Sequence, residues 1–421
     1  MPKRITRVRW SASGLPNGVS FDEITGTFSG TPKETGQFSV PVTVETNYKK
    51  ASERVTVNVI NPYWEIHGLL YNGNLTENAF LGRMYYGEYD ENSGEQLIFP
   101  LQQYQLTNST YGKYYIVNPS VDMSEKSDFN PRVGDIFIEL FDSGGYVSRN
   151  EVGKATVVDW CYNSSENKLY HVKQSPPSVR LYYGIGGNSN QFLKMSAGHF
   201  CSLCYSPSLN ILLAFTSKGK VVKREDERYV MNGNKYTVNN LNTYTGISTG
   251  MSSINPHCSA WSSNAEVFCV AGSTGVALSP DGETWTTYTS TDIPKNLVDL
   301  EYRKDLGRFF ARGGNDNLCY TSQDGITWEC VSNTPIPLST VARLAYGKEC
   351  NLYCAVGGTG KYAYFSKDLE TWETSQVSDT NITASDIIYF HEANSWVLLP
   401  TKTTSPSENC FYVKDTRDLT I

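Results

Sequence analysis

The sequence predicts an all-β protein with more than one domain. Short apolar and aromatic runs alternate with turns rich in Gly and Pro, which is typical of many short strands. The composition agrees, because the 421 residues include 28 Tyr and 34 Gly but only 19% charged residues. A seven-residue motif also occurs three times near the C-terminus, with its tryptophans 43 and then 44 residues apart. A period of that length in a β-rich chain predicts the blades of a β-propeller.

The repeated motif, called the S-x-D motif below, reads Ser-x-Asp-Gly-x-Thr-Trp. Ser and Asp at the mouth of a hairpin can accept hydrogen bonds from the turn backbone, and Gly relieves the strain of the turn. Trp then starts the return strand and packs against the neighbouring sheet. The motif residues are Ser279, Asp281, Gly282, Thr284, Trp285, Ser322, Asp324, Gly325, Thr327, Trp328, Ser366, Asp368, Thr371 and Trp372. The third copy has Leu369 in the place of Gly.

The motif resembles the Asp-box (BNR repeat) of sialidases, sortilin-type receptors and photosystem assembly factors, although each copy is one residue shorter than the pattern of that family. In the family, the Asp-box is a structural hairpin on the propeller rim, away from the ligand face. The resemblance therefore implies that these residues stabilise the fold and are not catalytic.

A longer pattern surrounds the motif. An aromatic residue, a polar turn and an apolar run recur six times. The six starting residues are Trp160, Tyr205, Trp261, Tyr302, Tyr346 and Tyr389. We predict a propeller over residues 158–421 with six blades, or seven if residues before Trp160 contribute one. The strand near Phe411–Val413 should close the ring by pairing with the beginning of the domain.

The first 61 residues predict a small β-sandwich. Apolar residues alternate strictly over 38–44 and 55–59, which indicates half-buried strands. The stretch from Gly14 to Pro32 resembles the immunoglobulin-like module whose signature is GLPxGLSFDxxTGxxSGTP. Few residues precede Trp10, so we expect either an open sheet edge or a strand supplied by a neighbouring chain or an upstream segment.

Residues 62–157 predict a middle β-domain, with an apolar strand over Val133–Leu140. The stretch from Pro131 to Val158 resembles small domains of phage fibre and tail proteins.

Charge and hydropathy exclude several partners. The chain has 36 basic and 43 acidic residues and a net charge of −7. It lacks a basic stripe, so nucleic acid is not an expected partner. No apolar run reaches the roughly 18 residues that cross a bilayer, and no apolar stretch follows Lys3 and Arg4. We therefore expect no membrane insertion and no signal peptide, and a location in the cytosol or in a particle assembled there.

The sequence predicts no active site, metal site or cofactor. A sialidase would need three arginines around a carboxylate, but the early Arg-Ile-Pro signature is absent and the blade arginines have no recurring spacing. Other glycosidases need two carboxylates in a cleft. The available acids are Asp299, Glu301, Asp305, Asp386 and Glu392, which we interpret as a solvated rim. Cys201 and Cys204 form a Cys-x-x-Cys without the second pair that zinc requires, and the histidines are isolated.

The ten cysteines all lie between Cys161 and Cys410 and are too uneven for a disulfide scaffold. We interpret Cys269 and Cys354 as buried, reduced thiols in apolar blade strands. Cys319 and Cys330 flank the second motif and could face each other across its hairpin, so the sequence leaves a disulfide there open.

The combination of an immunoglobulin-like module with a propeller resembles virion proteins of tailed phages, of the tail or fibre type. This implies a non-enzymatic protein, oligomeric in an assembly, whose N-terminal module docks on other virion proteins. Its propeller would bind a host-surface glycan or protein. The polar insertion Lys220–Asn242, with Tyr229, Tyr236 and Asn240, is the expected contact loop, unless it is only a mobile surface excursion.

Three other functions stay open. A bacterial surface adhesin would share both modules. A polysaccharide-cleaving glycosidase would share the propeller and should lose cleavage when Asp299 or Glu392 is changed. A structural decoration or spacer would need no ligand.

Overall fold

The computed structural model describes residues 8–30, 32–33, 36–59, 64–68, 80–86, 89–90, 95–96, 113–117, 136–141, 156–163, 165, 168–174, 179–183, 192–195, 200–226, 228–236, 245–390, 393–400 and 410–419. The elements in this part of the chain are strands, apart from the short 3-10 helices η4 (Met251–Ser253) and η6 (Thr416–Asp418). The predicted all-β class is therefore confirmed. The chain divides into two compact units, Met1–Trp64 with Lys414–Thr420 and Glu65–Val413 with Ile421. No described helix has the length and apolar character to cross a membrane.

The N-terminal module contains the two sheets of the predicted sandwich. In the first, β4 (Gly36–Thr46) pairs with β1 (Val8–Ala12) on one side and β5 (Lys50–Val59) on the other. The second pairs β2 (Val19–Asp22) with β3 (Thr27–Gly30).

In this module the backbone of Gly26 lies against the ring of Trp10. Gly26 has a φ of +72°, and a Cβ there would lie 3.1 Å from the Trp10 ring. The position therefore requires both a left-handed backbone and the absence of a side chain. Nearby, the Phe21 and Phe28 rings pack with centroids 4.9 Å apart.

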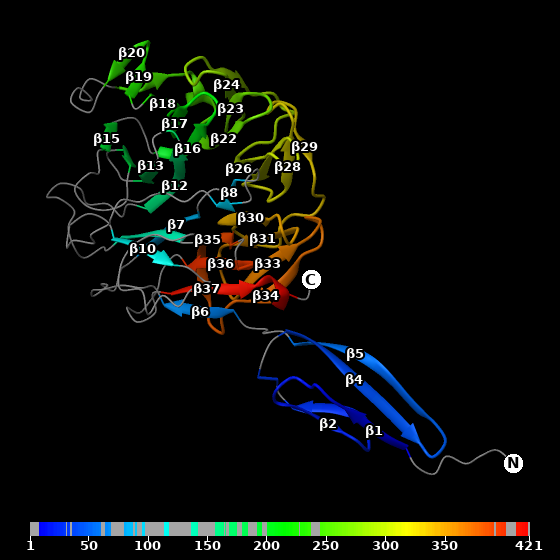
Figure 1. The fold of residues 1–421 in the computed structure, drawn as a ribbon. Coiled ribbons are helices and arrows are strands. Elements are labelled where there is room, and N and C mark those ends of the chain that lie inside the picture. Colours follow the sequence, from blue (N-terminus) through cyan, green and yellow to red (C-terminus); the bar gives the residue numbers. More distant parts are fainter. Residues whose placement is uncertain are drawn as a thin grey trace. The chain divides into compact units, whose positions relative to one another are not determined.

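Seven sheets of the second unit form a ring, which is the predicted β-propeller (Figure 1). Their inner strands are β7 (Phe80–Tyr86), β12 (Thr156–Asn163), β16 (Phe200–Ser206), β22 (Pro256–Ser262), β26 (Leu297–Arg303), β30 (Arg343–Gly347) and β35 (Ile382–Phe390). Each of the first four contacts the next, β30 contacts β35, and β35 returns to β7. An ion pair between Arg343 and Asp299 joins β30 to β26, so the ring is continuous.

The remaining strands complete the sheets outward. The first sheet adds β11 (Ile136–Phe141) and β10 (Lys113–Val117), and the second adds β13 (Lys168–Gln174), β14 (Val179–Tyr183) and β15 (Phe192–Met195). The third adds β17 (Ile211–Thr216), β18 (Lys220–Glu225), β19 (Arg228–Met231), β20 (Asn234–Tyr236) and β21 (Ile247–Ser248), the fourth β23 (Val267–Gly272), β24 (Val276–Ser279) and β25 (Thr286–Tyr288), and the fifth β27 (Arg308–Gly313), β28 (Cys319–Ser322) and β29 (Glu329–Cys330). The sixth adds β31 (Leu352–Val356), β33 (Tyr362–Ser366) and β34 (Glu373–Gln376), and the seventh adds β32 (Thr359–Gly360), β36 (Ser395–Pro400), β37 (Cys410–Asp415) and β6 (Glu65–Gly68). A separate hairpin pairs β8 (Tyr89–Asp90) with β9 (Glu95–Gln96).

The ring has seven blades because residues before Trp160 contribute one, the alternative that the sequence left open. Its inner strand is β7. The predicted closing strand near Phe411–Val413 is β37, which pairs with β6 in the order β35-β36-β37-β6, and not with the residues after 158 at which the sequence predicts the start of the propeller. The strand that completes the last sheet thus follows the N-terminal module directly in the sequence. Strands β6, β7, β10 and β11, from the span predicted as a middle domain, all belong to sheets of the ring.

The middle strands of the sheets form the core. All six residues of β17 and all six of β36 are buried, because neighbouring sheets cover both of their faces. This burial explains why these strands read as continuous apolar runs rather than as alternating patterns.

Candidate functional site

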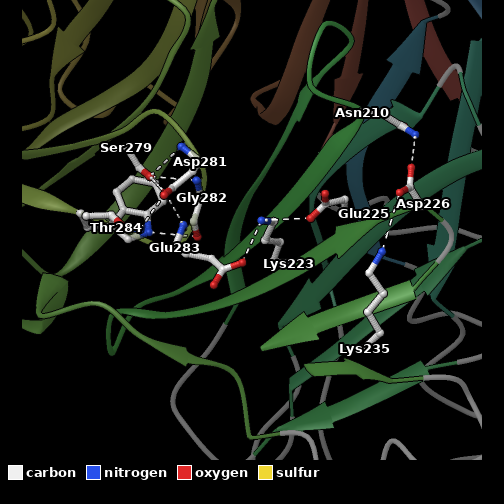
Figure 2. A network of polar contacts seen from close by, with 11 residues as sticks. Asn210, Lys223, Glu225, Asp226, Lys235, Ser279, Asp281, Gly282, Glu283 and Thr284 are labelled. Atoms are coloured by element: carbon white, nitrogen blue, oxygen red, sulfur yellow. Dashed lines mark hydrogen bonds and ion pairs between the residues drawn. The ribbon is translucent and has the colours of Figure 1, made fainter. Parts of the chain in front are cut away.

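Each S-x-D motif forms the same turn between the third and fourth strands of its sheet. Figure 2 shows the first: Ser279 Oγ accepts a hydrogen bond from the Gly282 N–H at 2.8 Å. Asp281 Oδ1 accepts from the N–H groups of Glu283 at 2.8 Å and Thr284 at 2.7 Å. The second and third motifs repeat these contacts at 2.7 to 2.9 Å. The polar groups of the motif are therefore engaged by its own backbone.

The motifs also fasten each sheet to the preceding one. A Cβ on Gly282 would lie 2.8 Å from Leu213 Cδ2, and the Trp285 ring packs edge-on against Phe215 at 5.5 Å. Leu213 and Phe215 both belong to β17 of the previous sheet. The second motif makes the equivalent approach, since a Cβ on Gly325 would lie 2.9 Å from Leu278 Cδ2.

The third motif carries Leu369 in the same left-handed conformation, with a φ of +65°. Leu369 is only 4% exposed and belongs to an apolar cluster that includes Phe310 of the preceding sheet. The buried apolar area of Leu369 therefore offsets the strain of a side chain at positive φ.

An ion pair crosses the junction between the third and fourth sheets (Figure 2). Lys223 Nζ lies 2.9 Å from Glu283 Oε1 of the first motif and 3.1 Å from Glu225 Oε2. The Lys223 side chain is only 7% exposed. Burial acts to lower the pKa of Lys223, but the hydrogen bonds to the two glutamates outweigh it, and the pKa is raised. Lys223 is therefore a charged group inside the junction.

The opposite end of the sheets presents a different set of loops. In an antiparallel four-stranded sheet, the loop between the second and third strands and the loop that enters the next sheet share one end. For the fourth to sixth sheets this end comprises residues 249–255, 273–275, 289–296, 314–318, 331–342 and 357–361, called the loop face below. The S-x-D motifs lie at the other end.

Hydrogen bonds tie the loop face together from sheet to sheet. Asn255 Nδ2 donates to Ser273 Oγ at 2.9 Å, and the Asn296 N–H donates to the Ser273 carbonyl at 2.9 Å. The chain of contacts continues from Asn296 Nδ2 to Asn315 Oδ1 at 2.9 Å and from Asn317 Nδ2 to the Leu338 carbonyl at 3.0 Å. The amide and hydroxyl groups of this face are therefore held in fixed positions.

Glycines allow the backbones of these loops to approach closely. A Cβ on Gly272 would lie 2.3 Å from the Ile254 carbonyl oxygen, and one on Gly314 would lie 2.5 Å from Asn296 Nδ2. Asn255 and Asn296 both adopt left-handed backbone conformations, with φ of 49° and 56°. Asparagine tolerates this region better than most residues, which explains its recurrence at these entries.

His257 adds an imidazole to the same face. Its Nε2 lies 3.0 Å from Ser273 Oγ, and its Nδ1 is buried without a hydrogen-bond partner. Burial lowers the pKa of His257, so the neutral ring is favoured at neutral pH. Asn255, His257 and Ser273 together place an amide, an imidazole and a hydroxyl within one hydrogen-bonded group.

The loop face was not predicted from the sequence. A signal was present, because two glycines lie at or just after the end of the second strand in each of three consecutive sheets, at Gly272 and Gly275, at Gly313 and Gly314, and at Gly357 and Gly358. Left-handed asparagines before the inner strands are the matching feature. Neither signal alone predicts the hydrogen bonds between sheets.

An ionic cluster combines buried Asp299, Arg312 and Asp386 with the half-buried Arg343. Asp299 Oδ2 accepts from Arg312 Nε at 2.9 Å, and its Oδ1 accepts from Arg343 Nη1 at 3.4 Å. Arg343 Nε also lies 3.8 Å from Asp386 Oδ1. Burial opposes the charge of Arg343, but the nearby carboxylates of Asp299 and Asp386 raise its pKa. The cluster joins the fifth, sixth and seventh sheets.

The other acids weighed for glycoside hydrolysis are placed differently. Arg303 holds Asp305 through bonds of 3.1 and 3.0 Å, and its guanidinium lies 3.7 Å from the centroid of the Tyr346 ring. Burial raises the pKa of Glu301. Glu392 lies outside the described residues.

The predicted contact loop differs from what we expected. Residues 220–225, 228–231 and 234–236 form the strands β18, β19 and β20 of the third sheet rather than a loop. Tyr229 is 2% exposed and packs in the core with Tyr170, while the Arg224 guanidinium lies 5.0 Å from its ring centroid. Tyr236 is half-buried against the same cluster. Asn240 lies outside the described residues. Tyr229 is therefore a core residue and not an exposed contact residue.

Cys269, Cys319, Cys330 and Cys354 are free thiols. Cys269 and Cys354 are fully buried, as expected from their apolar strands, and burial raises the pKa of both. Cys330 pairs across the hairpin with Tyr320 and not with Cys319. This one-residue offset directs the two cysteines to opposite faces of the sheet, so they do not form a disulfide. Among the described residues, no three potential metal ligands cluster.

The fold defines the class of protein: a ring of seven sheets preceded by a small sandwich, a combination that suggests a binding or structural role. Residues 2–60 match the family described as "Putative Ig domain", so the N-terminal module is immunoglobulin-like. No curated protein sequence shows significant similarity to the chain.

Several solved structures are distantly similar. The structure of YCF48 bound to a D1 peptide is 12% identical with a TM-score of 0.43, and the match covers 85% of this chain and 96% of that one. The WD40 β-propeller domain of Doa1 is 12% identical with a TM-score of 0.41, covering 66% and 87%. Virginiamycin B lyase from Staphylococcus aureus, a catalytically inactive form with quinupristin, is 9% identical with a TM-score of 0.47, covering 74% and 98%. The propeller assignment rests on the strand pairing of this chain itself.

Proposed function

We propose that this chain is a non-enzymatic virion protein of a tailed phage, of the tail or fibre type. In this proposal the propeller recognises a host-surface glycan or protein, and the immunoglobulin-like module docks on other virion proteins. The S-x-D motifs act as Asp-box hairpins that stabilise the ring.

One observation supports recognition above the other candidate functions. The loop face holds amides and hydroxyls in fixed positions on consecutive sheets, linked from Asn255 through Ser273 and Asn296 to Asn315. Amides and hydroxyls both donate and accept hydrogen bonds, as the hydroxyls of a sugar require. Groups that are already ordered lose little entropy on binding, which favours affinity.

Two of the carboxylates weighed for hydrolysis are paired with arginines. Asp299 and Asp305 are each held by arginines at about the distance of a direct hydrogen bond. A glycosidase needs one carboxylic acid and one free carboxylate facing each other across the scissile bond. The hydrogen bond from Arg303 lowers the pKa of Asp305, so Asp305 does not supply that acid. Glu301, whose pKa burial raises, is the candidate acid that the glycosidase alternative would need.

The test is a glycan array probed with the intact chain, in which both retention and release of fragments are measured. We expect retention without cleavage. The variant Asn255→Gly with Asn296→Gly removes two loop-face amides while it keeps the left-handed backbone, and it should lose binding. Asn351→Gly is the matched control, because Asn351 has the same backbone conformation, with a φ of 50°, in the β30–β31 turn at the motif end.

The other outcomes separate the remaining functions. Fragment release by the intact chain would establish a glycosidase, and its loss in Glu301→Gln would identify the acid. Absence of binding to glycans and to whole bacterial cells would favour a spacer. Retention on host cells together with blocked adsorption of the phage that carries this protein would support a receptor-binding virion part over a bacterial adhesin.

A further inference from the structure

The N-terminal module has an inner face that its own strands do not cover. Val40 of β4 is fully buried, and Val55 lies directly opposite it on β5. Opposed residues on antiparallel neighbours point to the same face of a sheet. Val55 therefore belongs to the inner face, yet it is 40% exposed. A two-stranded second sheet, β2 with β3, is too narrow to cover all three strands of the first.

Exposed apolar side chains concentrate in this module. Nine large hydrophobic residues are exposed in the part of the chain that the structure describes, and five of them lie between residues 8 and 55. These five are Val8, Ile24, Phe28, Tyr48 and Val55. The described part of the propeller is several times larger and exposes only four.

Strand β5 offers a long open edge next to this face. It has ten residues and pairs with β4 over its whole length, from Lys50 opposite Glu45 to Val59 opposite Gly36. No other described strand pairs with it. Unpaired N–H and C=O groups along such an edge are a template for another strand.

The charged side chains of β5 indicate which residues a strand pairing with its open edge should have. Side chains alternate between faces along a strand, so Lys50 and Arg54 share the outer face, while Glu53, Val55 and Val57 share the inner one. Lys50 and Arg54 are both exposed, and Arg54 makes a 3.1 Å bond to Ser39 Oγ on the same face. Opposite charges directly across a strand pair are stabilising, and like charges are destabilising.

We propose that the β5 edge accepts an extended strand from a partner protein, with apolar residues on one face and carboxylates on the other. The apolar residues pack beside Val55 and Val57, while the carboxylates face Lys50 and Arg54. The backbone of the incoming strand takes up the unpaired groups of β5. This inference rests on the docking role in the proposed function, but the propeller takes no part in it.

The test uses the full-length chain and two fluorescent peptides, one alternating Val with Glu and one alternating Val with Lys. Anisotropy titration should show that the Val-Glu peptide binds at least about tenfold more tightly, which is about 1.4 kcal/mol. The double variant Lys50→Glu with Arg54→Glu should reverse this preference. Hydrogen exchange should show new protection over residues 50–59 when the Val-Glu peptide is bound to the wild type.

Controls keep the result interpretable. Lys50 lies opposite Glu45, so the double variant should lower the thermal unfolding midpoint slightly. Lys50→Gln with Arg54→Gln avoids this like-charge pair and should abolish the preference without reversing it. Equal affinity for both peptides, no binding of either, or an unchanged preference in the double variant would overturn the proposal. Self-association that the double variant abolishes, without peptide binding, would overturn it in favour of a second copy. Glycan retention should be unaffected, which separates this test from that of the propeller.

Discussion

Asp299 holds Arg312 by two contacts to a single oxygen, with Oδ2 at 2.9 Å from Nε and 2.8 Å from Nη2. Asp299 does so from a left-handed backbone position inside β26, with a φ of 52°, at an irregularity in the pairing with β27. Both side chains are less than a tenth exposed. A strained backbone position is thus retained where it directs a carboxylate toward a buried guanidinium.

Breaking this pair should be strongly destabilising. We expect Asp299→Asn to lower the free energy of unfolding by roughly 3–5 kcal/mol, because it leaves Arg312 charged and buried without its partner. Replacing both residues together, with Asp299→Asn and Arg312→Met, should cost less than the two single changes combined. Urea unfolding of the four proteins gives the coupling energy. A coupling energy near zero would show that the Asp299–Arg312 pair does not stabilise the fold.

The S-x-D turns should make the stability of the fold depend on pH in the acidic range. Burial acts to raise the pKa of Asp281, but the hydrogen bonds from the Thr284 and Glu283 N–H groups outweigh it, and the pKa falls below its usual 3.8. A lowered folded-state pKa stabilises the fold above the unfolded value, and that contribution disappears as the pH falls through the folded value. Asp281→Asn should therefore be less stable than the wild type near neutral pH, with a difference that shrinks below about pH 4. Thermal unfolding midpoints from about pH 6 to about pH 2 test this; a difference constant with pH would contradict it.

The leucine of the third motif should contribute to stability despite its backbone conformation. Leu369→Gly removes a buried side chain, which costs about 2–5 kcal/mol in other cores, and relieves about 1–2 kcal/mol of left-handed strain. We expect a net loss of roughly 1–3 kcal/mol in the free energy of unfolding. Gly325→Ala is the converse control. It should also destabilise, because its Cβ would meet Leu278 Cδ2 at 2.9 Å at a φ of +76°. A more stable Leu369→Gly variant would show that strain dominates.

The Lys223 ion pair should make the stability of the fold depend on pH in the alkaline range. Its pKa is raised above 10.5 because the bonds to Glu283 and Glu225 outweigh the effect of burial. A raised folded-state pKa stabilises the fold below the unfolded value and stops doing so as the pH rises through the folded value. Lys223→Leu introduces the residue found at the equivalent position of the next sheet, Leu278. The variant should not lose stability as the pH rises, and its free energy of unfolding near neutral pH should be close to that of the wild type. Glu283→Gln should destabilise instead. Unfolding measured on both sides of about pH 10.5 distinguishes the two variants.

The thiols should differ sharply in reactivity. Cys330 is exposed, whereas Cys269 and Cys354 are fully buried and have raised pKa values. Thiolate access controls alkylation, so iodoacetamide under native conditions should modify Cys330 and spare the other two. Peptide mass mapping identifies the modified residues. Recovery of Cys319 and Cys330 as a linked peptide would contradict the strand register.

Local patterns were sufficient to predict much of this fold. The S-x-D spacing predicted the hairpin turns, and the aromatic residues Trp160, Tyr205 and Trp261 all lie on inner strands of consecutive sheets. Turn chemistry and strand alternation depend on residues only a few positions apart, so a single sequence contains them. The prediction was wrong at Tyr229. A polar, charged stretch suggested a loop, but it forms strands that bury the ring beside Tyr170.

The sequence by itself determined that the chain is all-β, that it begins with an immunoglobulin-like module and that a periodic propeller follows. Only the tertiary structure decided that the ring has seven sheets, that β6 closes it, and that Asn255, Ser273 and Asn296 form one face. The same holds for Asp299, which meets Arg343 from a strand more than forty residues away. The physical reason is that a repeat fixes each sheet through short-range contacts, whereas ring closure and the contacts between sheets depend on side-chain volume and charge brought together across the fold.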